Sequence, residues 1–386
     1  MYRHLHPGPQ LRLSCRRRPG THDEVLTIGS RLGPEQTSHV RFGENGKALT
    51  LEGEPGSEDG LFVALGHFDA VAVIGHLSYG TAFETPIGRG AKRVPLIAVP
   101  NVSTGSDEKT IGALVEAVRV SGAVVLDIHS DAIHERSVFT VTEREDALTG
   151  AMVALSQGTR VLDLTMQPGV HPRVGVFDVC PFVPHGDTKM TDAVSAARAV
   201  GPLIAERSGM PVYLYGEAAL RPATRHLPDL RRGGLAGLRS RAQHGLEPDF
   251  GGRIDPRLGV VCVGAREVLI AFNVWIRGDL AIARAIAGRV RESAGGLPGV
   301  RSLGLEITPP DICQVSMNLT APGATGIEAA FEAVEANAGA MGATVLATEI
   351  VGLPPGRFWP PPDAKATRLL REPGRSLEEA LREAGL

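Results

Sequence analysis

The sequence predicts an α/β (α+β) protein built from two ferredoxin-like βαββαβ subdomains. Three observations carry this prediction. From residue 94 onward, apolar runs of strand length alternate with segments of helical periodicity. The last third of the chain follows the order β-α-β-β-α-β, the split βαβ unit with helices on one face of an antiparallel sheet. The preceding region begins with the same order and then extends it.

Length and composition exclude several classes of protein. The chain has 386 residues, of which 43% are hydrophobic and 22% charged, and its formal net charge is −3. These values are typical of a globular enzyme and exclude disorder along most of the chain. The longest apolar runs are far shorter than the roughly 18 residues of a membrane span. The charge gives no reason to expect nucleic acid as a partner.

The cysteines and the start of the chain bear on the compartment. None of the four cysteines forms a C-x-x-C pair, so we expect free thiols in a reducing compartment rather than disulfides. No apolar region of the secretory type is present near the start. We therefore expect a cytoplasmic protein, although the Arg-rich, acid-free residues 1–20 leave an organellar transit peptide as an alternative.

Periodicity divides the chain into four parts. The predicted parts are an N-terminal extension of doubtful structure at 1–93, a first subdomain at 94–264, a second subdomain at 265–356 and a C-terminal tail at 357–386. In the tail, Ser376 and Glu379 form a capping box that opens a short helix. We assign the tail to docking.

Apolar patterning gives the elements of the first subdomain in order. Strands are predicted at 96–99, 123–128, 137–142, 160–164, 174–182 and 211–215, and helices at 107–120, 145–156 and 191–207. In the first helix, Ile111, Leu114 and Val118 recur at helical spacing. Residues 216–266 lack periodicity and carry a cluster of arginines between 221 and 241. This stretch is either an inter-domain linker or an anion-recognising loop.

The second subdomain has a clearer pattern. Strands are predicted at 268–275, 302–307, 312–319 and 343–350, and helices at 279–292 and 327–340. These six elements form one complete βαββαβ unit.

The strongest candidate for catalysis is His171. It lies in the segment GVHPRVG, where Pro172 forces extended backbone on the histidine and the glycines permit close approach of a ligand. Because imidazole titrates near neutrality, this side chain suits proton transfer during acyl or imidoyl transfer between amines. The segment lies between two predicted strands, so we expect the imidazole at a sheet edge.

A second polar cluster, DIHSDAIHER at 127–136, follows a buried strand. Its histidines and acids could suggest a metal site, but their spacing matches no ligand motif, and we expect no metal. Arg136 could bind a substrate carboxylate through two parallel hydrogen bonds or form a surface ion pair with Glu135 or Asp131. Walker A, G-x-G-x-x-G and G-x-S-x-G motifs do not occur.

Eight ordered segments resemble glutamate formimidoyltransferase. They are VPNVSTG at 99–105, LDIHSD at 126–131 with RSVFT at 136–140, VHPRVGVFDVCPF at 170–182, PVYLYGEA at 211–218, PDFG at 248–251, GAREVLIAFN at 264–273, QVSMN at 314–318 and EIVGLP at 349–354. The resemblance runs from about residue 94 to 353. It covers the transferase part, with nothing similar to the cyclodeaminase domain that is fused to it in animals.

The resemblance implies transfer of the formimino group from N-formimino-L-glutamate to tetrahydrofolate in histidine degradation. It also implies that His171 is the catalytic general base. Tetrahydrofolate is then expected to bind as co-substrate between the two subdomains of a homodimeric enzyme. The residues that it implies for binding substrate or folate are Asn101, Asp127, His129, Arg136, Arg173, Arg225, Arg231, Gly251, Gly252, Arg253 and Gly259.

Departures from the family leave alternatives open. Glu135 stands where an Asn is usual in the family. Near a glutamate-derived substrate, its negative charge would repel the carboxylates of the substrate unless arginines compensate for that charge. The loop from Gly251 to Gly259 is one residue shorter than in the family. The alternatives are formyl transfer between 5-formyltetrahydrofolate and glutamate or another amino acid, and a non-catalytic folate-binding paralogue.

Overall fold

A computed structural model describes four strands between residues 12 and 52, and residues 96–142, 147–166, 169–307 and 311–386. The chain divides into two compact units, Met1–Gly90 and Ala91–Leu386. The first unit contains an antiparallel sheet in the order β1-β2-β3-β4. Its strands are β1 (Arg12–Arg17), β2 (Glu24–Gly29), β3 (Thr37–Phe42) and β4 (Ala48–Glu52). None of these strands is among the elements predicted above.

The second unit opens with a seven-stranded mixed sheet. Its strands are β5 (Ile97–Ala98), β6 (Asn101–Val102), β7 (Val124–Asp131), β8 (Arg136–Thr142), β9 (Phe177–Val183), β10 (Val212–Gly216) and β11 (Val261–Ala265). The helices between them are α1 (Glu108–Val120), α2 (Leu148–Gly158), α3 (Met190–Ser208), α4 (Leu227–Arg231) and α5 (Gly234–Ala242).

This sheet contains a complete ferredoxin-like unit. β5 and β6 are two halves of one strand, interrupted where Pro100 cannot donate to the ladder. Both halves lie between β9 and β8, antiparallel to each, and β7 pairs with the far side of β8. The order is therefore that of a βαββαβ sheet, extended beyond β9 by the parallel strands β11 and β10.

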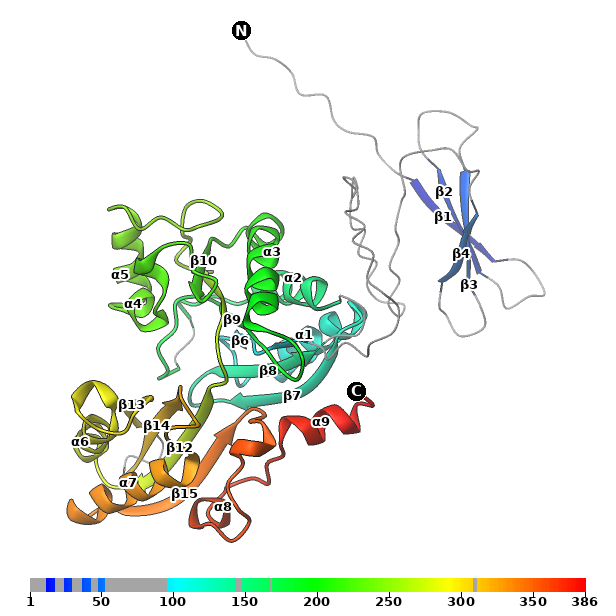
Figure 1. Ribbon diagram of the computed structural model, residues 1–386. Helices are drawn as coiled ribbons and strands as arrows, with labels where there is room; N and C mark the ends of the chain where they lie inside the picture. The colour runs from blue at the N-terminus through cyan, green and yellow to red at the C-terminus, as the bar shows by residue number, and fades with distance from the viewer. Residues whose placement is uncertain are drawn as a thin grey trace. The chain divides into compact units, whose positions relative to one another are not determined.

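The second subdomain repeats the arrangement. Its elements are β12 (Ile270–Arg277), α6 (Leu280–Val290), β13 (Val300–Glu306), β14 (Ile312–Leu319), α7 (Ile327–Ala340) and β15 (Thr344–Val351). The strands are antiparallel in the order β13-β14-β12-β15. The prediction of two ferredoxin-like subdomains is thus confirmed (Figure 1).

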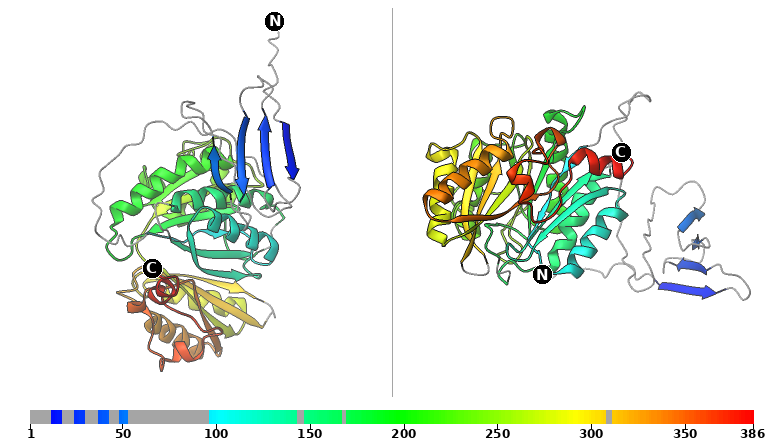
Figure 2. Two further views of the ribbon diagram at one scale, coloured as in Figure 1. Left: turned by 90° about the vertical axis from the view of Figure 1, so that its right-hand side faces the viewer. Right: turned by 90° about the horizontal axis from the view of Figure 1, so that it is seen from below.

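Each sheet has a separate hydrophobic core beneath its helices. In the first subdomain, Leu114, Leu155 and Ile204 of α1, α2 and α3 pack against strand residues such as Phe139 and Phe182. A second core places α6 and α7 on one face of the other sheet. Each sheet therefore has one face that these helices leave uncovered. The two further views in Figure 2 show the cyan-to-green and yellow-to-orange parts as two bodies in contact.

Two sequence predictions within this unit are wrong. Residues 160–164 are not a strand, because Thr159–Val161 form a 3-10 turn that ends α2 and an irregular segment follows. Residues 216–266 are not an inter-domain linker. They form α4, α5 and β11, and Leu230 and Leu238 of the short helices pack over Tyr213 and Cys262. The described cysteines, Cys180, Cys262 and Cys313, are free, as predicted, and they are buried.

The tail joins both subdomains. After β15 it forms α8 (Lys365–Arg368) and α9 (Leu377–Glu383), and α9 has the predicted capping box at Ser376. Leu377 and Leu381 of α9 are buried against Ile97 and Leu126 of the first sheet. Nearer its start, the tail hydrogen-bonds to Thr348 of β15. The expectation that it docks is confirmed.

Replacing Leu381 with alanine should lower the free energy of unfolding by about 2–3 kcal/mol, because the substitution removes buried methyl groups beneath α9. Chemical denaturation provides the measurement. The exposed neighbour Arg382 is the matched control, and Arg382→Ala should change stability by less than about 0.5 kcal/mol. Equal effects of the two substitutions would show that α9 does not dock here.

Candidate functional site

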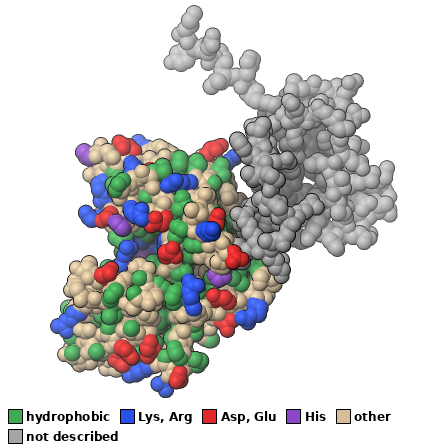
Figure 3. Space-filling model, in the orientation of Figure 1, with side chains coloured by type: hydrophobic (Ala, Val, Ile, Leu, Met, Phe, Trp, Pro, Cys, Tyr) green, Lys and Arg blue, Asp and Glu red, His purple; other side chains and the backbone are tan. Residues whose placement is uncertain are grey.

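A cavity of about 140 Å³ lies where the open faces of the two sheets meet. Strands β6 to β9 line it from the first subdomain, and β12, β14 and β15 line it from the second. The described surface is hollowed between the part that carries α4 and α5 and the part that carries α6 (Figure 3). Five of the residues predicted for the site line this cavity, namely Asn101, His129, Arg136, His171 and Arg231.

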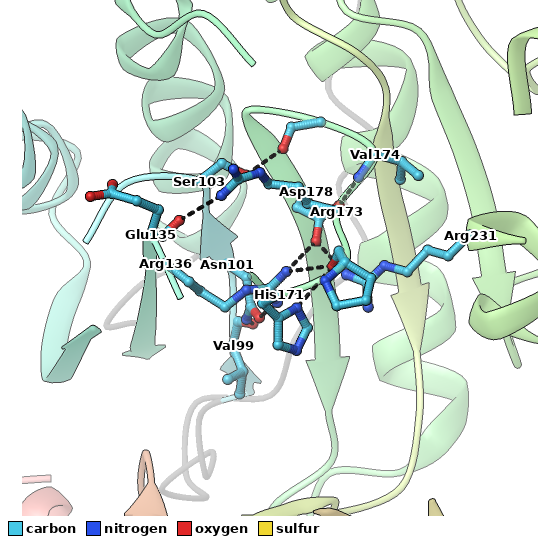
Figure 4. Close-up of polar contacts among 12 residues, drawn as sticks. Val99, Asn101, Ser103, Glu135, Arg136, His171, Arg173, Val174, Asp178 and Arg231 are labelled. Carbon is cyan, nitrogen blue, oxygen red and sulfur yellow. Dashed lines mark hydrogen bonds and ion pairs between the residues drawn. The ribbon is translucent and has the colours of Figure 1, made fainter. Parts of the chain in front are cut away.

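The buried carboxylate of Asp178, on β9, organises the first-subdomain wall. Its Oδ2 accepts hydrogen bonds from Nη2 of Arg136, at 2.8 Å, and from Nη2 of Arg231. Its Oδ1 accepts the backbone N–H of Val174 at 2.8 Å. Figure 4 shows these groups converging beside His171. Two guanidinium groups share one carboxylate, so this cluster of three side chains carries a net positive charge.

Arg136 is held by two further contacts. Its Nη1 donates to Oδ1 of Asn101 at 2.7 Å, and its Nη2 also donates to the carbonyl oxygen of Pro172 at 3.1 Å. Burial lowers the pKa of Arg136 to about 10, and the nearby charge of Arg231 adds to the shift while Asp178 opposes it. The guanidinium therefore stays protonated at neutral pH.

His171 has a defined tautomer and a depressed pKa. Its Nδ1 lies 2.9 Å from the carbonyl oxygen of Pro172. Because a carbonyl can only accept, Nδ1 carries the hydrogen and Nε2 keeps its lone pair. Burial lowers the pKa of His171, and the charges of Arg136 and Arg231 lower it further, to well below 6.5. The imidazole is therefore neutral and basic at Nε2 near pH 7.

The position of His171 differs from the sequence expectation in one respect. Its loop follows a 3-10 turn rather than a strand, and it leads into β9, an interior strand of the sheet. The imidazole thus lies in the cavity at the middle of the sheet and not at an edge.

The second subdomain contributes acceptor groups. Glu349 on β15 lies 3.4 Å from Nε2 of His129, and it accepts a hydrogen bond of 2.8 Å from Nδ2 of Asn273. Burial lowers the pKa of His129, but the hydrogen bond and charge of Glu349 more than offset this and raise its pKa. Burial raises the pKa of Glu349, but the hydrogen bonds from His129 and Asn273 outweigh it and lower the pKa.

The remaining predicted residues do not line the cavity. Asp127 lines a neighbouring cavity of about 370 Å³, which shares His129 and Glu349 with the first. Arg173 donates to the carbonyl oxygen of Glu135 at 3.2 Å. Gly251, Gly252, Arg253, Gly259 and Arg225 lie outside the lining.

Backbone packing explains the glycine at the end of the 251–259 loop. Gly259 has a φ of 73°, and a Cβ there would overlap the carbonyl oxygen of Val174. Val176 donates its N–H to Leu258 at 2.9 Å. The end of this loop therefore packs against the backbone that follows His171.

The arginine cluster is dispersed in the structure. Arg225 pairs with Glu217 at the surface, and Arg221 pairs with the buried Asp249. Of the arginines between 221 and 241, Arg231 is the one that lines the cavity. It does so because α4 ends at Arg231, where the guanidinium pairs with the carboxylate of Asp178.

Glu135 does not line the cavity. Its carboxylate accepts hydrogen bonds from the backbone N–H of Gly105, at 3.1 Å, and from the hydroxyl of Ser106. Figure 4 shows the side chain directed away from His171. Its φ of 46° is unusual for a residue other than glycine. The departure that raised doubt about the substrate is therefore outside the cavity.

Sequence reasoning missed Asp178, Gln314 and Glu349 as members of the site. Asp178 lies in the otherwise apolar run VFDVCPF, and a buried carboxylate in such a run requires a partner. That signal was available. Gln314 and Glu349 fall within segments that carry the family resemblance, but nothing in their spacing places them opposite His134 and His129.

Two kinds of feature are absent from the described part of the chain. No group of three or more His, Cys, Asp or Glu side chains there is placed to hold a metal ion. Within the same residues, no helix is both long and apolar enough to cross a membrane.

Comparison with known proteins gives a consistent match to the same region. Residues 96–266 match the formiminotransferase domain, N-terminal subdomain, and residues 271–358 match the formiminotransferase domain. The chain is 35% identical over 264 residues to the glutamate formimidoyltransferase of Streptococcus pyogenes, covering 67% of this chain and 88% of that protein. It is 36% identical over 263 residues to the enzyme of that name from Thermoplasma acidophilum, covering 67% and 87%.

A longer relative matches through part of its length. The formimidoyltransferase-cyclodeaminase of Sus scrofa is 36% identical over 267 residues, which cover 67% of this chain and 49% of that protein.

Asp178→Asn should lower the free energy of unfolding by about 3–5 kcal/mol, because it leaves two guanidinium groups without their buried counter-charge. The matched control is Asp163→Asn, which removes the partner of the exposed Arg257 and should cost less than about 1 kcal/mol. Urea denaturation of both variants measures the difference. A loss at Asp178 no larger than at Asp163 would contradict the central role of this carboxylate.

Proposed function

The chain belongs to the formiminotransferase domain family, and from this we propose that it transfers the formimino group of N-formimino-L-glutamate to tetrahydrofolate. The products are 5-formiminotetrahydrofolate and L-glutamate. Two relatives more than 30% identical, each matched over 87% or more of its length, are glutamate formimidoyltransferases and support this activity.

The single observation that carries the mechanism is the contact of His171 Nδ1 with the carbonyl oxygen of Pro172, which leaves the lone pair on Nε2 of a neutral ring that lines the cavity. In our proposal, N5 of tetrahydrofolate attacks the formimino carbon, and Nε2 takes the proton that N5 loses as the new C–N bond forms. The imidazolium then returns that proton to the glutamate nitrogen as its bond to the formimino carbon breaks. One proton is taken and one is returned, so His171 acts first as general base and then as general acid.

Arg136 and Arg231 give the cavity its affinity for acids. They share the single negative charge of Asp178, so one positive charge is left for a carboxylate of the substrate or of the folate. Burial and the same charge keep His171 unprotonated, since a buried imidazolium beside two guanidinium groups is disfavoured. One cluster thus favours both the binding of acids and the unprotonated state of the base. Both substrates lie between the subdomains in this proposal.

The proposal extends to the cellular setting. Tetrahydrofolate serves as co-substrate, the reaction requires no metal, and the enzyme works as a cytoplasmic homodimer without nucleic acid or membrane partners. Tetrahydrofolate as co-substrate fits the family, and light scattering on the purified protein tests the dimer.

The formyl-transfer alternative uses the same base and cavity, and donor competition distinguishes it. Formiminoglutamate and N-formylglutamate compete for one site, and formimino transfer predicts that the first is used with the higher kcat/KM. The non-catalytic alternative rested on Glu135 and on the shortened loop. Both lie outside the cavity lining.

His171→Ala should reduce kcat for formimino transfer by two to four orders of magnitude, because it removes the group that moves the proton. Tetrahydrofolate affinity, measured by calorimetry, should stay within a few-fold of the wild type. His226→Ala, at an exposed histidine outside the cavity, is the control and should retain wild-type turnover. Near-normal turnover of His171→Ala would exclude the assigned base.

The pH profile tests the charge that surrounds His171. The base must be neutral, so kcat/KM should fall with decreasing pH along an acid limb whose midpoint lies below 6.5. Arg231→Met removes a positive charge that disfavours protonation, so the pKa of His171 rises and the midpoint moves to higher pH. The midpoint, rather than the height of the profile, is the readout. An unchanged midpoint in this variant would show that the charge of Arg231 does not influence the pKa of His171.

A further inference from the structure

A second histidine lies beside the proposed base. His134 is 6% exposed and lines the cavity, and its ring centroid is 5.9 Å from that of His171 in an edge-to-face arrangement. It follows β7 in the turn before β8, so it belongs to the first subdomain. The mechanism proposed above gives it no role.

A chain of hydrogen bonds from the second subdomain fixes the tautomer of His134. Nε2 of Gln314 lies 3.4 Å from Oε2 of Glu349, and a carboxylate can only accept, so the amide nitrogen of Gln314 faces Glu349. Its Oε1 consequently faces His134, 2.9 Å from Nε2 of the ring. That oxygen also can only accept. In the neutral ring the hydrogen is therefore on Nε2, and Nδ1 has a lone pair.

This Nδ1 is buried and has no hydrogen-bond partner among the residues that the structure describes. An acceptor left unpaired in the interior costs about 1–3 kcal/mol, which a ligand N–H can recover. Asp131 also lines this part of the cavity, with Oδ2 4.0 Å from Nε2 of His134, and so does Glu349. Around His134 the cavity therefore offers acceptors, whereas Arg136 and Arg231 offer donors.

We propose that His134 is the specificity residue by which the cavity selects a formimino donor over a formyl donor. The inference rests on the proposed function and deepens it. The two donors differ at one group, because the formimino carbon carries an N–H where the formyl carbon carries a carbonyl oxygen. The lone pair of His134 Nδ1 accepts the N–H and repels the oxygen. A single tautomer, set by Gln314 and Glu349, thus distinguishes an amidine from an amide.

The test is the ratio of kcat/KM for formiminoglutamate to kcat/KM for N-formylglutamate, measured on the full chain with tetrahydrofolate as acceptor. The wild type should favour the formimino donor. His134→Phe retains the ring and removes the acceptor, so the ratio should fall about 10- to 100-fold, mainly through the formimino donor.

Gln314→Glu tests the tautomer from the other subdomain. Gln314 is fully buried and does not line the cavity. A carboxylate in its place favours the imidazolium form of His134, whose Nδ1 then donates, so the ratio should fall and formyl transfer should rise relative to the wild type. Gln157→Glu makes the same chemical change at an exposed position of α2 and should leave the ratio unchanged.

Each outcome separates the two proposals. Transfer of neither group by the wild type, or of the formyl group alone, refutes the proposed function. Formimino transfer with a ratio near one in the wild type refutes the specificity role without any variant. Circular dichroism shows which of His134→Phe and Gln314→Glu folds. If a folded variant transfers the formimino group with an unchanged ratio, the specificity role is also refuted.

Discussion

The site depends on one buried carboxylate. Asp178 bonds to two arginines that lie 42 and 53 residues away in the sequence, and to the backbone N–H that ends the His171 loop. Removing a carboxylate from water is costly unless its partners satisfy it. Strand β9, the hairpin of β7 and β8, and the end of α4 are therefore held in one arrangement. The loop that carries His171 is part of that arrangement.

The charge balance of this cluster explains the chemistry that it supports. Two positive groups and one negative group leave an excess that suits acidic substrates, and burial together with the same excess keeps His171 neutral. The carbonyl oxygen of Pro172 fixes the tautomer of this neutral ring, because it accepts the hydrogen on Nδ1 of His171. Across the cavity, Glu349 and Gln314 of the second sheet place oxygen atoms opposite Nε2 of His129 and Nε2 of His134, respectively. The two subdomains thus supply opposite walls of one cavity, with Arg136 and Arg231 on the first and Glu349 on the second.

The sequence predicts those parts of the fold that depend on local patterning. Helix 107–120 and the six elements of the second subdomain have apolar residues at regular spacing, and the structure contains all of them. The predicted strand at 160–164 fails because the short apolar run RVLDL ends α2 in a turn instead of pairing. Helices α4 and α5 were missed because each has a single fully buried leucine, too little to give a period.

The site was predictable in its chemistry but not in its contacts. His171 stands out by residue type and by its Pro and Gly neighbours, and Arg136 by its position at the end of a polar cluster. The partnership of Arg231 with Asp178 depends on how α4 packs over β9, which no local pattern records. Glu135 shows the opposite error, because proximity in sequence to Arg136 suggested a role in the cavity while its backbone turns it toward Gly105.

The protonation state of His171 is the central claim, and ¹⁵N NMR of the imidazole nitrogens at pH 7 tests it most directly. His171→Gln, which removes one set of signals, provides the assignment. The structure predicts a neutral ring with the hydrogen on Nδ1 and an unprotonated Nε2, resonating at the low-field position of a bare imidazole nitrogen. An imidazolium at this pH, or a neutral ring with its hydrogen on Nε2, would contradict the account.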